Sequence, residues 1–343
     1  MLTRHLDADD LRQLLRRLGP EALLREIAAA LREDFLRWEQ FDKIPRCASH
    51  CRQGVIELMP VADGERHAFK YVNGHPGNPA LGLPTVMAFG VLSDMATGAP
   101  LLLSELTLTT ALRTAATSAL AAQVLARPDA RTMALIGNGA QAEFQALAFM
   151  SLVGVRRLRV YDTDRRATAK LLRNLQPYVD AGRLSIEPCA STAEAVQGSD
   201  IVTTATADKS HAAILAAGLI APGMHLNALG GDCPGKTELD PRILQHAHVF
   251  VEYAPQSRLE GEIQHMPHDF EVTELWRVLA GQAPGRTHPD QVTVFDSVGF
   301  ALEDFSALRT LERLAREHEL GRLLSLVPAM ADPKDLWGWA HGG

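Results

Sequence analysis

The sequence of 343 residues has little cysteine, no excess of positive charge and no long uninterrupted apolar run. Its four cysteines are too few for the disulfide framework of a small secreted domain. The formal net charge of −7 excludes binding of nucleic acid through bulk positive charge. The longest uncharged apolar run, 212–225, is shorter than a membrane-spanning helix and contains two glycines and a proline.

The N-terminal residues also lack the apolar core of a signal peptide, because they run directly into acidic residues. We therefore expect a soluble cytoplasmic protein without a membrane partner. Cys47, His50 and Cys51 do not have the spacing of a zinc knuckle, and no second cysteine pair matches them. We expect ordinary reduced thiols and no metal site.

The length suggests two domains, and the hydrophobic pattern changes between them. The first part has two amphipathic helices, at 7–18 and 20–41, followed by short apolar segments in direct succession. Strands joined by short turns predict an antiparallel sheet. These strands are expected at 55–59, 68–72, 85–89 and 101–103.

An Ala-rich helix at 109–125 leads into strands that alternate with helices, as in a parallel doubly wound sheet. A last amphipathic helix at 299–317 is expected to return to the first domain. We predict an α/β protein with a Rossmann-type domain over 131–300. A second α+β domain with an antiparallel sheet is predicted over 1–130, completed by 301–343. The parallel strands are expected at 132–136, 157–161, 184–187, 201–204, 224–229, 249–252 and 292–295.

A glycine-rich turn, Gly137-Asn138-Gly139-Ala140-Gln141-Ala142, lies between an expected strand and an expected helix. In the pattern G-x-G-x-x-A the first glycine permits a tight turn, and the second lets the backbone approach a pyrophosphate. The backbone N–H groups at the helix N-terminus then bind the phosphates. A purely structural turn is the alternative.

An acidic residue, Asp162, ends the next expected strand. A carboxylate at that position binds the ribose 2′-hydroxyl of NAD and repels the 2′-phosphate of NADP. Arg165 and Arg166 lie close enough in the sequence to weaken this preference, but Asp162 outweighs them. We therefore expect NAD as the cofactor.

Charged residues interrupt two apolar strands of the first part. Glu57 and Lys70 each stand between two large apolar residues. Burying a lone charge costs several kcal/mol, so each residue must face solvent or have a partner. The period of the strands leaves both possibilities open.

Two further charged residues stand where a site is plausible. Arg113 is expected in the first turn of the helix at 109–125, where a cation opposes the helix macrodipole by roughly 0.3–1 kcal/mol. A bound anion would reverse that cost, and an exposed Arg113 is the alternative. Asp232 follows two glycines after an expected strand, where ligands bind in doubly wound sheets. It suits proton transfer, and the alternative is an ordinary turn residue.

These residues resemble the ornithine cyclodeaminase/mu-crystallin family over nearly the whole chain. The most specific match is the run from Asp232 to Glu238, Asp-Cys-Pro-Gly-Lys-Thr-Glu, which separates the cyclodeaminases of that family from its ketimine reductases and alanine dehydrogenases. The matching stretches are 69–76, 106–122, 134–141, 227–239 and 293–299.

The resemblance implies a homodimer whose sheets join across the interface, with substrate binding and dimerisation in the first domain. It implies that Arg46, Lys70 and Arg113 hold the substrate carboxylate. Glu57 and Val298 lie beside the substrate, and Asp232 is the catalytic acid and base. The implied NAD contacts are Thr85, Arg113, Thr117, Gly137, Gly139, Ala140, Gln141, Asp162, Thr206, Leu229, Gly230, Gly231, Asp232, Lys236 and Ser297.

The implied activity is conversion of L-ornithine to L-proline and ammonia. A hydride leaves Cα, the δ-amine attacks C2 with loss of ammonia, and the hydride returns, so that NAD is regenerated. Three cations exceed the charge of one carboxylate, and we expect the cofactor pyrophosphate, Glu57 and Asp232 to offset them. The alternatives are a lysine cyclodeaminase, since one methylene is worth only about 1–3 kcal/mol, an NAD(P)H-dependent ketimine or pyrroline-2-carboxylate reductase, and a non-enzymatic binding protein.

Overall fold

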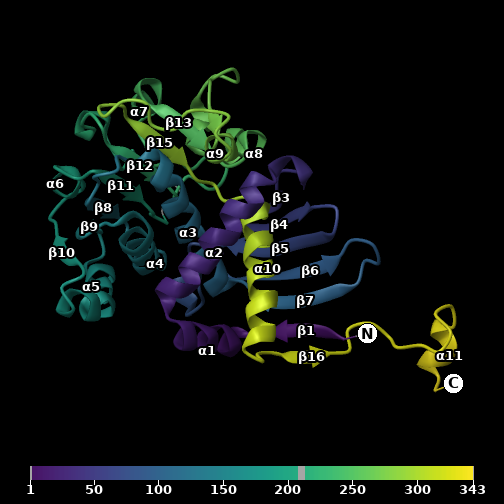
Figure 1. Ribbon diagram of the computed structural model, residues 1–343. Coiled ribbons are helices and arrows are strands. Elements are labelled where there is room, and N and C mark those ends of the chain that lie inside the picture. The colour runs from purple at the N-terminus through teal and green to yellow at the C-terminus, as the bar shows by residue number, and fades with distance from the viewer. Residues whose placement is uncertain (1, 208–212, 343) are drawn as a thin grey trace.

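Two sheets, each of eight strands, organise residues 2–207 and 213–342, which this computed structural model describes (Figure 1). The first sheet has the order β16-β1-β7-β6-β5-β4-β2, and β3 also pairs with β4. It is antiparallel as predicted, except that β1 runs parallel to β7. The strands are β1 (Thr3–Leu6), β2 (Asp42–Lys43), β3 (Cys47–Cys51), β4 (Gly54–Ala62), β5 (Arg66–Gly74), β6 (Ala88–Asp94), β7 (Pro100–Glu105) and β16 (Arg322–Leu324).

The strand predicted at 85–89 begins later, at Ala88. The backbone N–H of Met87 donates to the side-chain oxygen of Asn73 at 2.6 Å, and ladder pairing with β5 starts only at Ala88 and Val72. The strands at 3–6, 42–43 and 47–51 were not predicted, because each is too short or too polar to show a period.

Four long helices pack beside the first sheet (Figure 1). In the capping box of α1 (Ala8–Leu18), the Asp7 carboxylate accepts the backbone N–H groups of Asp9 and Asp10. The helix predicted over 20–41 ends at Leu36, and a 3-10 turn, η1 (Trp38–Gln40), follows, where the Trp38 ring packs between Phe35 and Trp276. The other long helices are α2 (Pro20–Leu36), α3 (Thr107–Leu125) and α10 (Ala301–Glu317).

The second sheet is parallel throughout and has the order β10-β9-β8-β11-β12-β15-β13-β14. The chain leaves β8 in one direction and returns to β11 on its other side, which is the doubly wound arrangement that alternating strands and helices predicted. The strands are β8 (Thr132–Ile136), β9 (Arg157–Tyr161), β10 (Ser185–Pro188), β11 (Ile201–Thr204), β12 (His225–Ala228), β13 (His248–Val251), β14 (Thr273–Glu274) and β15 (Thr293–Asp296).

Helices of 5 to 16 residues connect these parallel strands, and a π-helical turn, η3, replaces the second half of the helix predicted at 141–152. The division of the chain at residues 130 and 300 stays a prediction. The elements are α4 (Ala142–Ala148), η3 (Phe149–Val153), α5 (Arg165–Asp180), α6 (Thr192–Val196), η4 (Ala217–Leu219), α7 (Pro241–His246), α8 (Ala254–Glu260), η5 (Glu262–His265) and α9 (Leu275–Leu279), while η2 (Asn78–Leu81) precedes β6.

The covered face of the first sheet is mostly apolar but carries two buried charged residues. Glu57 is 5% exposed and Lys70 1% exposed, and α10 packs on their face. The opposite face, which we call the outer face, is apolar and partly exposed within the described ranges. Leu58 is 46% exposed and Phe89 42% exposed, and the Tyr71 ring stacks on Phe89. The outer face consists of Ile56, Leu58, Phe69, Tyr71, Phe89 and Val91.

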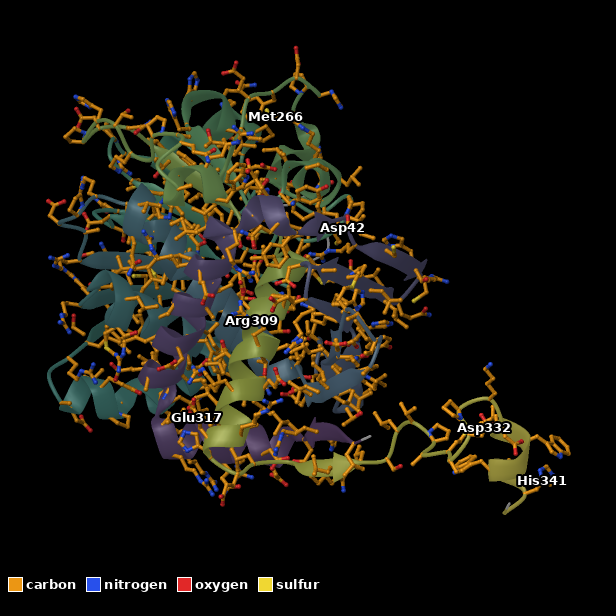
Figure 2. All side chains as sticks on the ribbon, turned by 45° about the vertical axis from the view of Figure 1, so that its right-hand side comes forward. Asp42, Met266, Arg309, Glu317, Asp332 and His341 are labelled. Carbon is orange, nitrogen blue, oxygen red and sulfur yellow. The ribbon has the colours of Figure 1, made fainter. Side chains whose placement is uncertain are left out.

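After β16 the chain leaves the sheets, and Figure 2 shows Asp332 and His341 on a segment that extends away from them. This segment ends in α11 (Leu336–Ala340), whose Trp337 is 77% exposed. None of the helices in the described ranges is long and apolar enough to cross a membrane.

Candidate active site

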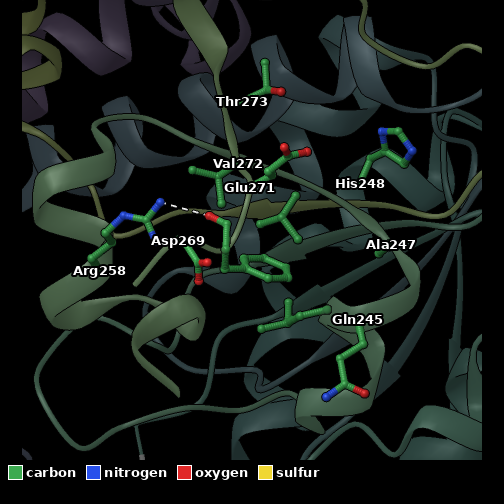
Figure 3. A pocket seen from close by; sticks show the side chains of 11 residues that line it. Gln245, Ala247, His248, Arg258, Asp269, Glu271, Val272 and Thr273 are labelled. Carbon is green, nitrogen blue, oxygen red and sulfur yellow. Dashed lines mark hydrogen bonds between the residues drawn. The ribbon is translucent and has the colours of Figure 1, made fainter. Parts of the chain in front are cut away.

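A groove of about 780 Å³ lies near β13 and β14, between α7 and α8 (Figure 3). Figure 3 shows Arg258 and Asp269 on one side of it and His248 on the other. None of the substrate-binding, cofactor-binding or catalytic residues predicted from the sequence lines this groove. The predicted residues gather at a different place, where the carboxyl ends of the parallel strands meet the first sheet.

Predicted site residues follow the carboxyl ends of three adjacent strands of the second sheet. Thr206 follows β11, residues 229–232 follow β12, and Ser297 and Val298 follow β15. Because the strands are parallel and neighbouring, their carboxyl ends lie side by side. Ligands bind beyond this edge in doubly wound sheets.

The glycine turn lies beyond β8 at the same edge. Gly137 has φ +94°, and a Cβ there would lie 2.6 Å from the carbonyl oxygen of Ala205, so only glycine fits. A Cβ on Gly139 would meet no atom within 4 Å, so the space beside the turn is open. No atom of the described chain accepts a hydrogen bond from the backbone N–H groups of residues 139–141. These N–H groups and the open space fit a dinucleotide pyrophosphate.

Asp162 lies where the ribose of that dinucleotide is expected. One carboxylate oxygen accepts the backbone N–H of Asn138 at 2.6 Å, and the other accepts the backbone N–H of Asp164 at 2.8 Å. These bonds fix Asp162 beside the glycine turn, and each oxygen retains a lone pair for a hydroxyl group.

Arg46 joins the two sheets. Its guanidinium lies 3.0 Å from Glu57 on β4 and 3.1 Å from Glu260 at the end of α8. It also donates to the backbone carbonyls of Val298 and Gly299. Burial raises the pKa of Glu260 to about 7, although the charge of Arg46 opposes this.

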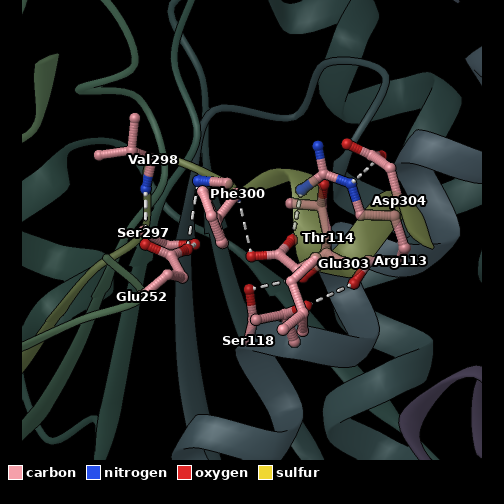
Figure 4. Close-up of polar contacts among 12 residues, drawn as sticks. Arg113, Thr114, Ser118, Glu252, Ser297, Val298, Phe300, Glu303 and Asp304 are labelled. Carbon is pink, nitrogen blue, oxygen red and sulfur yellow. Dashed lines mark hydrogen bonds and ion pairs between the residues drawn. The ribbon is translucent and has the colours of Figure 1, made fainter. Parts of the chain in front are cut away.

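Lys70 and Arg113 share one carboxylate, Asp304 on α10. The Lys70 ammonium lies 2.8 Å from Asp304, and Arg113 Nε lies 3.0 Å from it. Arg113 also donates to Glu303, as Figure 4 shows. Burial, and next the charge of Arg113, lower the pKa of Lys70 to about 8. Lys70 and Arg113 therefore lie side by side in the interior rather than facing solvent.

The expectation that Arg113 lies in a first helical turn is wrong. The helix α3 begins at Thr107, so Arg113 lies in its second turn. Its burial is compensated by Glu303 and Asp304, not by the helix terminus. A Cβ on Gly299 would lie 2.7 Å from Arg113, so the glycine makes room for the guanidinium.

The turn after β15 is fixed by Glu252, which follows β13. Its carboxylate accepts the Ser297 hydroxyl at 2.8 Å and the backbone N–H groups of Val298 and Gly299 (Figure 4). Burial, and next the charge of Glu303, raise the pKa of Glu252 to about 8. Val298 is 7% exposed, and its backbone carbonyl accepts a hydrogen bond from Arg46.

Asp232 is the exposed member of this group, with 52% of its side chain accessible. The Lys236 ammonium lies 3.1 Å from the Asp232 carboxylate. The negative charge of Asp232 contributes to raising the pKa of both Arg46 and Glu260. Asp232 therefore stands between the edge that carries the glycine turn and the buried cations. A carboxylate in this position can exchange protons with a bound amino acid.

Not every predicted residue joins this group through a hydrogen bond. Thr85 lies between η2 and β6, where its carbonyl accepts the His75 N–H. Thr117 is fully buried in α3, and its hydroxyl donates to the Arg113 carbonyl. Within the described ranges the Thr85 side chain has no hydrogen bond to another predicted cofactor contact, whereas Thr117 is bonded to the backbone of Arg113.

The structure also corrects the expectation that the three cations leave a surplus of positive charge at the site. Glu57 does offset Arg46 as predicted, but the other partners were missed. Glu260, Glu303 and Asp304 supply further negative charge within 3.1 Å of the three cations. Glu303 and Asp304 are adjacent to each other in an expected helix, so the criterion that selected Glu57, one charge between two apolar residues of a strand, does not find them.

The parallel doubly wound sheet, the glycine turn and the acid after β9 define a dinucleotide-binding protein of the Rossmann type, with a buried cationic site beside the dinucleotide edge. The sequence profile of the ornithine cyclodeaminase/mu-crystallin family matches residues 10–319. This chain belongs to that family.

Similar proteins agree with this assignment. A protein of Agrobacterium fabrum named ornithine cyclodeaminase is 58% identical over 320 residues, 93% of this chain and 89% of that protein. A solved lysine cyclodeaminase superposes with a TM-score of 0.90 at 33% identity, covering 97% of this chain and 99% of that one. An archaeal alanine dehydrogenase dimer with bound NAD superposes with a TM-score of 0.86 at 30% identity, covering 95% and 100%.

Proposed function

We propose that this chain converts L-ornithine to L-proline and ammonia with NAD as a recycled cofactor. The observation that carries the proposal is the cluster of three buried cations, Arg46, Lys70 and Arg113, of which Arg46 is close enough to feel the charge of Asp232 at the dinucleotide-binding edge. The names of close relatives support it, since the Agrobacterium fabrum protein is an ornithine cyclodeaminase.

The residues at the glycine turn would hold the cofactor, with the pyrophosphate at 139–141 and a ribose at Asp162. When bound, NAD supplies reversible hydride transfer at the substrate Cα. Reacting atoms must approach to roughly 3–3.5 Å, so the substrate has to be held rigidly. The hydrogen bonds of Glu252 provide a fixed wall at Ser297 and Val298.

The substrate carboxylate would lie against Lys70 and Arg113. Both side chains are less than a tenth exposed, and Asp304 holds them in a fixed relative position. Low accessibility to water strengthens each ionic contact. Arg46, already bound to Glu57 and Glu260, would close the end of the site.

Asp232 would transfer protons. The δ-amine of ornithine attacks C2 only when it is unprotonated, and an alkylamine with a pKa near 10.4 is almost fully protonated at neutral pH. The half-exposed Asp232 carboxylate can accept that proton and return one to the departing ammonia. The other product is a five-membered cyclic imine, whose reduction gives proline.

The related activities of the family are the alternatives. A lysine cyclodeaminase would differ by one methylene in the substrate, and a pyrroline-2-carboxylate reductase would consume reduced cofactor. The run from Asp232 to Glu238 favours a cyclodeaminase, and the relatives at 52–58% identity carry the ornithine name.

We also propose that the outer face joins two copies into a homodimer. Its side chains form cross-strand rows on β4, β5 and β6, with Leu58 opposite Tyr71 and Tyr71 opposite Phe89. Contiguous exposed apolar surface of this kind marks an interface. The archaeal alanine dehydrogenase relative is a dimer.

Isotopic labelling tests the activity. The protein is incubated with catalytic NAD and L-ornithine labelled with ¹⁵N at the δ-nitrogen. We expect labelled proline and unlabelled ammonia without net NADH. Labelled ammonia would contradict δ-amine attack on C2, and NADH that accumulates as ornithine is consumed would contradict a recycled cofactor. L-lysine in parallel decides the chain length.

A further inference from the structure

The Glu238 carboxylate, at the end of the Asp232–Glu238 run, points back to the loops that carry the site. One oxygen accepts both the backbone N–H and the hydroxyl of Thr206, at 2.7 and 2.5 Å. The other accepts the backbone N–H of Gly230 at 2.9 Å. Glu238 is 1% exposed and therefore ties the loop after β11 to the loop after β12.

A second buried carboxylate holds Glu238 itself. The two oxygens of Glu262, in η5, accept the backbone N–H groups of Glu238 at 2.8 Å and Leu239 at 3.0 Å. A third carboxylate, Asp296 at the end of β15, accepts the backbone N–H groups of Glu262 and Ile263 at 2.9 and 3.1 Å. Each carboxylate thus fixes the backbone of the residue that bears the next one.

Each carboxylate lies against a glycine. A Cβ on Gly230 would lie 2.0 Å from the carboxyl carbon of Glu238, and one on Gly231 would lie 2.7 Å from Glu262. A Cβ on Gly261 would lie 2.4 Å from Asp296. Three glycines therefore make room for the three carboxylates. Two of these glycines, Gly230 and Gly231, directly precede Asp232 in the sequence.

The series ends at Asp232. Lys236 donates to the carbonyl of Thr206 at 3.1 Å and to the Asp232 carboxylate at 3.1 Å. Burial lowers the pKa of Lys236, but the charges of Asp232 and Glu238 outweigh burial and leave it raised. The position of Asp232 thus depends on Thr206, which Glu238 holds.

Carboxylates are costly as buried acceptors for backbone N–H groups, because burial of an unpaired charge is unfavourable. Glu262 and Asp296 are almost fully buried and form no ion pair within the described chain, so each negative charge is buried without a counter-ion. A glutamine would avoid that cost but has only one acceptor oxygen, so its amide N–H groups would face a backbone N–H. Only a carboxylate offers two acceptors to two loops.

We propose that Glu238 and Glu262 are positioning residues, which set the place of Asp232 and of the cofactor-facing turns at Thr206 and Gly230. This role rests on the proposed cyclodeaminase activity, in which Asp232 moves protons. It does not require either carboxylate to touch substrate.

The test compares Glu238→Gln and Glu262→Gln in the full chain with a matched control, Asp200→Asn. Asp200 also accepts two backbone N–H groups, those of Arg131 and Thr132 at 2.9 Å, but it precedes β11, at the opposite edge of the sheet. For each protein we would measure thermal stability, NAD affinity by calorimetry, kcat per bound NAD, and KM for ornithine.

We expect Glu238→Gln to weaken NAD binding and to lower kcat per bound NAD by roughly tenfold or more each, with KM for ornithine within about threefold, because the cations at Asp304 are untouched. Glu262→Gln, which acts one step farther away, should change both in the same direction even if Glu238→Gln does not fold. Asp200→Asn should lower stability alone.

Two results would overturn the proposal. One is an unchanged NAD affinity and kcat per bound NAD in both glutamine variants. The other is an equal loss in Asp200→Asn, which would show a general effect of stability. A wild-type protein that binds NAD but does not turn over ornithine would contradict the proposed function, while the comparison of NAD affinities would still test the positioning role.

Discussion

Asp304 offers the sharpest perturbation of the cationic site. It is 2% exposed and is the shared partner of Lys70 and Arg113, at 2.8 and 3.0 Å. In Asp304→Asn the shape is kept and the charge is lost. Removing one partner of a buried ion pair costs about 3–5 kcal/mol. Because Arg113 retains Glu303, we expect the lower value, about 3 kcal/mol, in the free energy of unfolding.

The same variant should change the pH dependence of substrate binding. Burial and Arg113 already lower the pKa of Lys70 to about 8, while Asp304 opposes them. Without Asp304 the pKa falls further, so the ammonium that binds the substrate carboxylate is lost at lower pH. We therefore expect an alkaline decline of kcat/KM for ornithine near pH 8 in the wild type and at lower pH in the variant.

Urea unfolding and a kcat/KM profile from about pH 6 to pH 9 measure both effects. Glu312→Gln is the control, since Glu312 lies on the same helix and its one ion pair among the described residues is with the exposed Arg316, an interaction worth roughly 0.5 kcal/mol or less. An Asp304→Asn protein as stable as this control, with an unshifted alkaline limb, would refute the role assigned to Asp304.

Three further predictions concern other parts of the site and the outer face. Asp232→Asn should retain NAD affinity and lose most turnover, measured by calorimetry and ammonia release; near-normal turnover would exclude its acid and base role. Asp162→Asn should raise the Kd of NAD about tenfold and reduce its advantage over NADP, and an unchanged ratio of the two affinities would be inconsistent with a ribose contact. Leu58→Arg should convert a dimer into monomers of 37.3 kDa in light scattering, whereas a wild-type monomer would remove the basis of the proposed interface.

The sequence was most informative where a local pattern determines the structure. The apolar run Thr132–Ile136 has the predicted bounds, because a strand buried in a parallel sheet is apolar along its length. Arg157–Tyr161 also has the predicted bounds, because its buried Leu158 and Val160 alternate with more polar residues. The glycine turn was equally clear, since the close approach to Ala205 excludes a side chain at Gly137.

The first sheet shows what a local pattern does not determine. Alternation in β4 places Glu57 on the opposite face of the sheet from Ile56 and Leu58, but it does not determine which of the two faces a helix covers. That depends on α10, whose Asp304 is 234 residues from Lys70. The carboxylates at 238, 262 and 296 escaped prediction for the same reason, because their partners are backbone N–H groups of distant loops.

The return of the hydride to the molecule it came from is most directly tested with L-ornithine deuterated at Cα. The labelled substrate is incubated with the protein, catalytic NAD and an excess of unlabelled NADH, and the proline is analysed by mass spectrometry. We predict that proline retains the deuterium at C2, because the cofactor stays bound between the two transfers. Proline that carries hydrogen from the free NADH would contradict a recycled cofactor and favour reduction of a released imine.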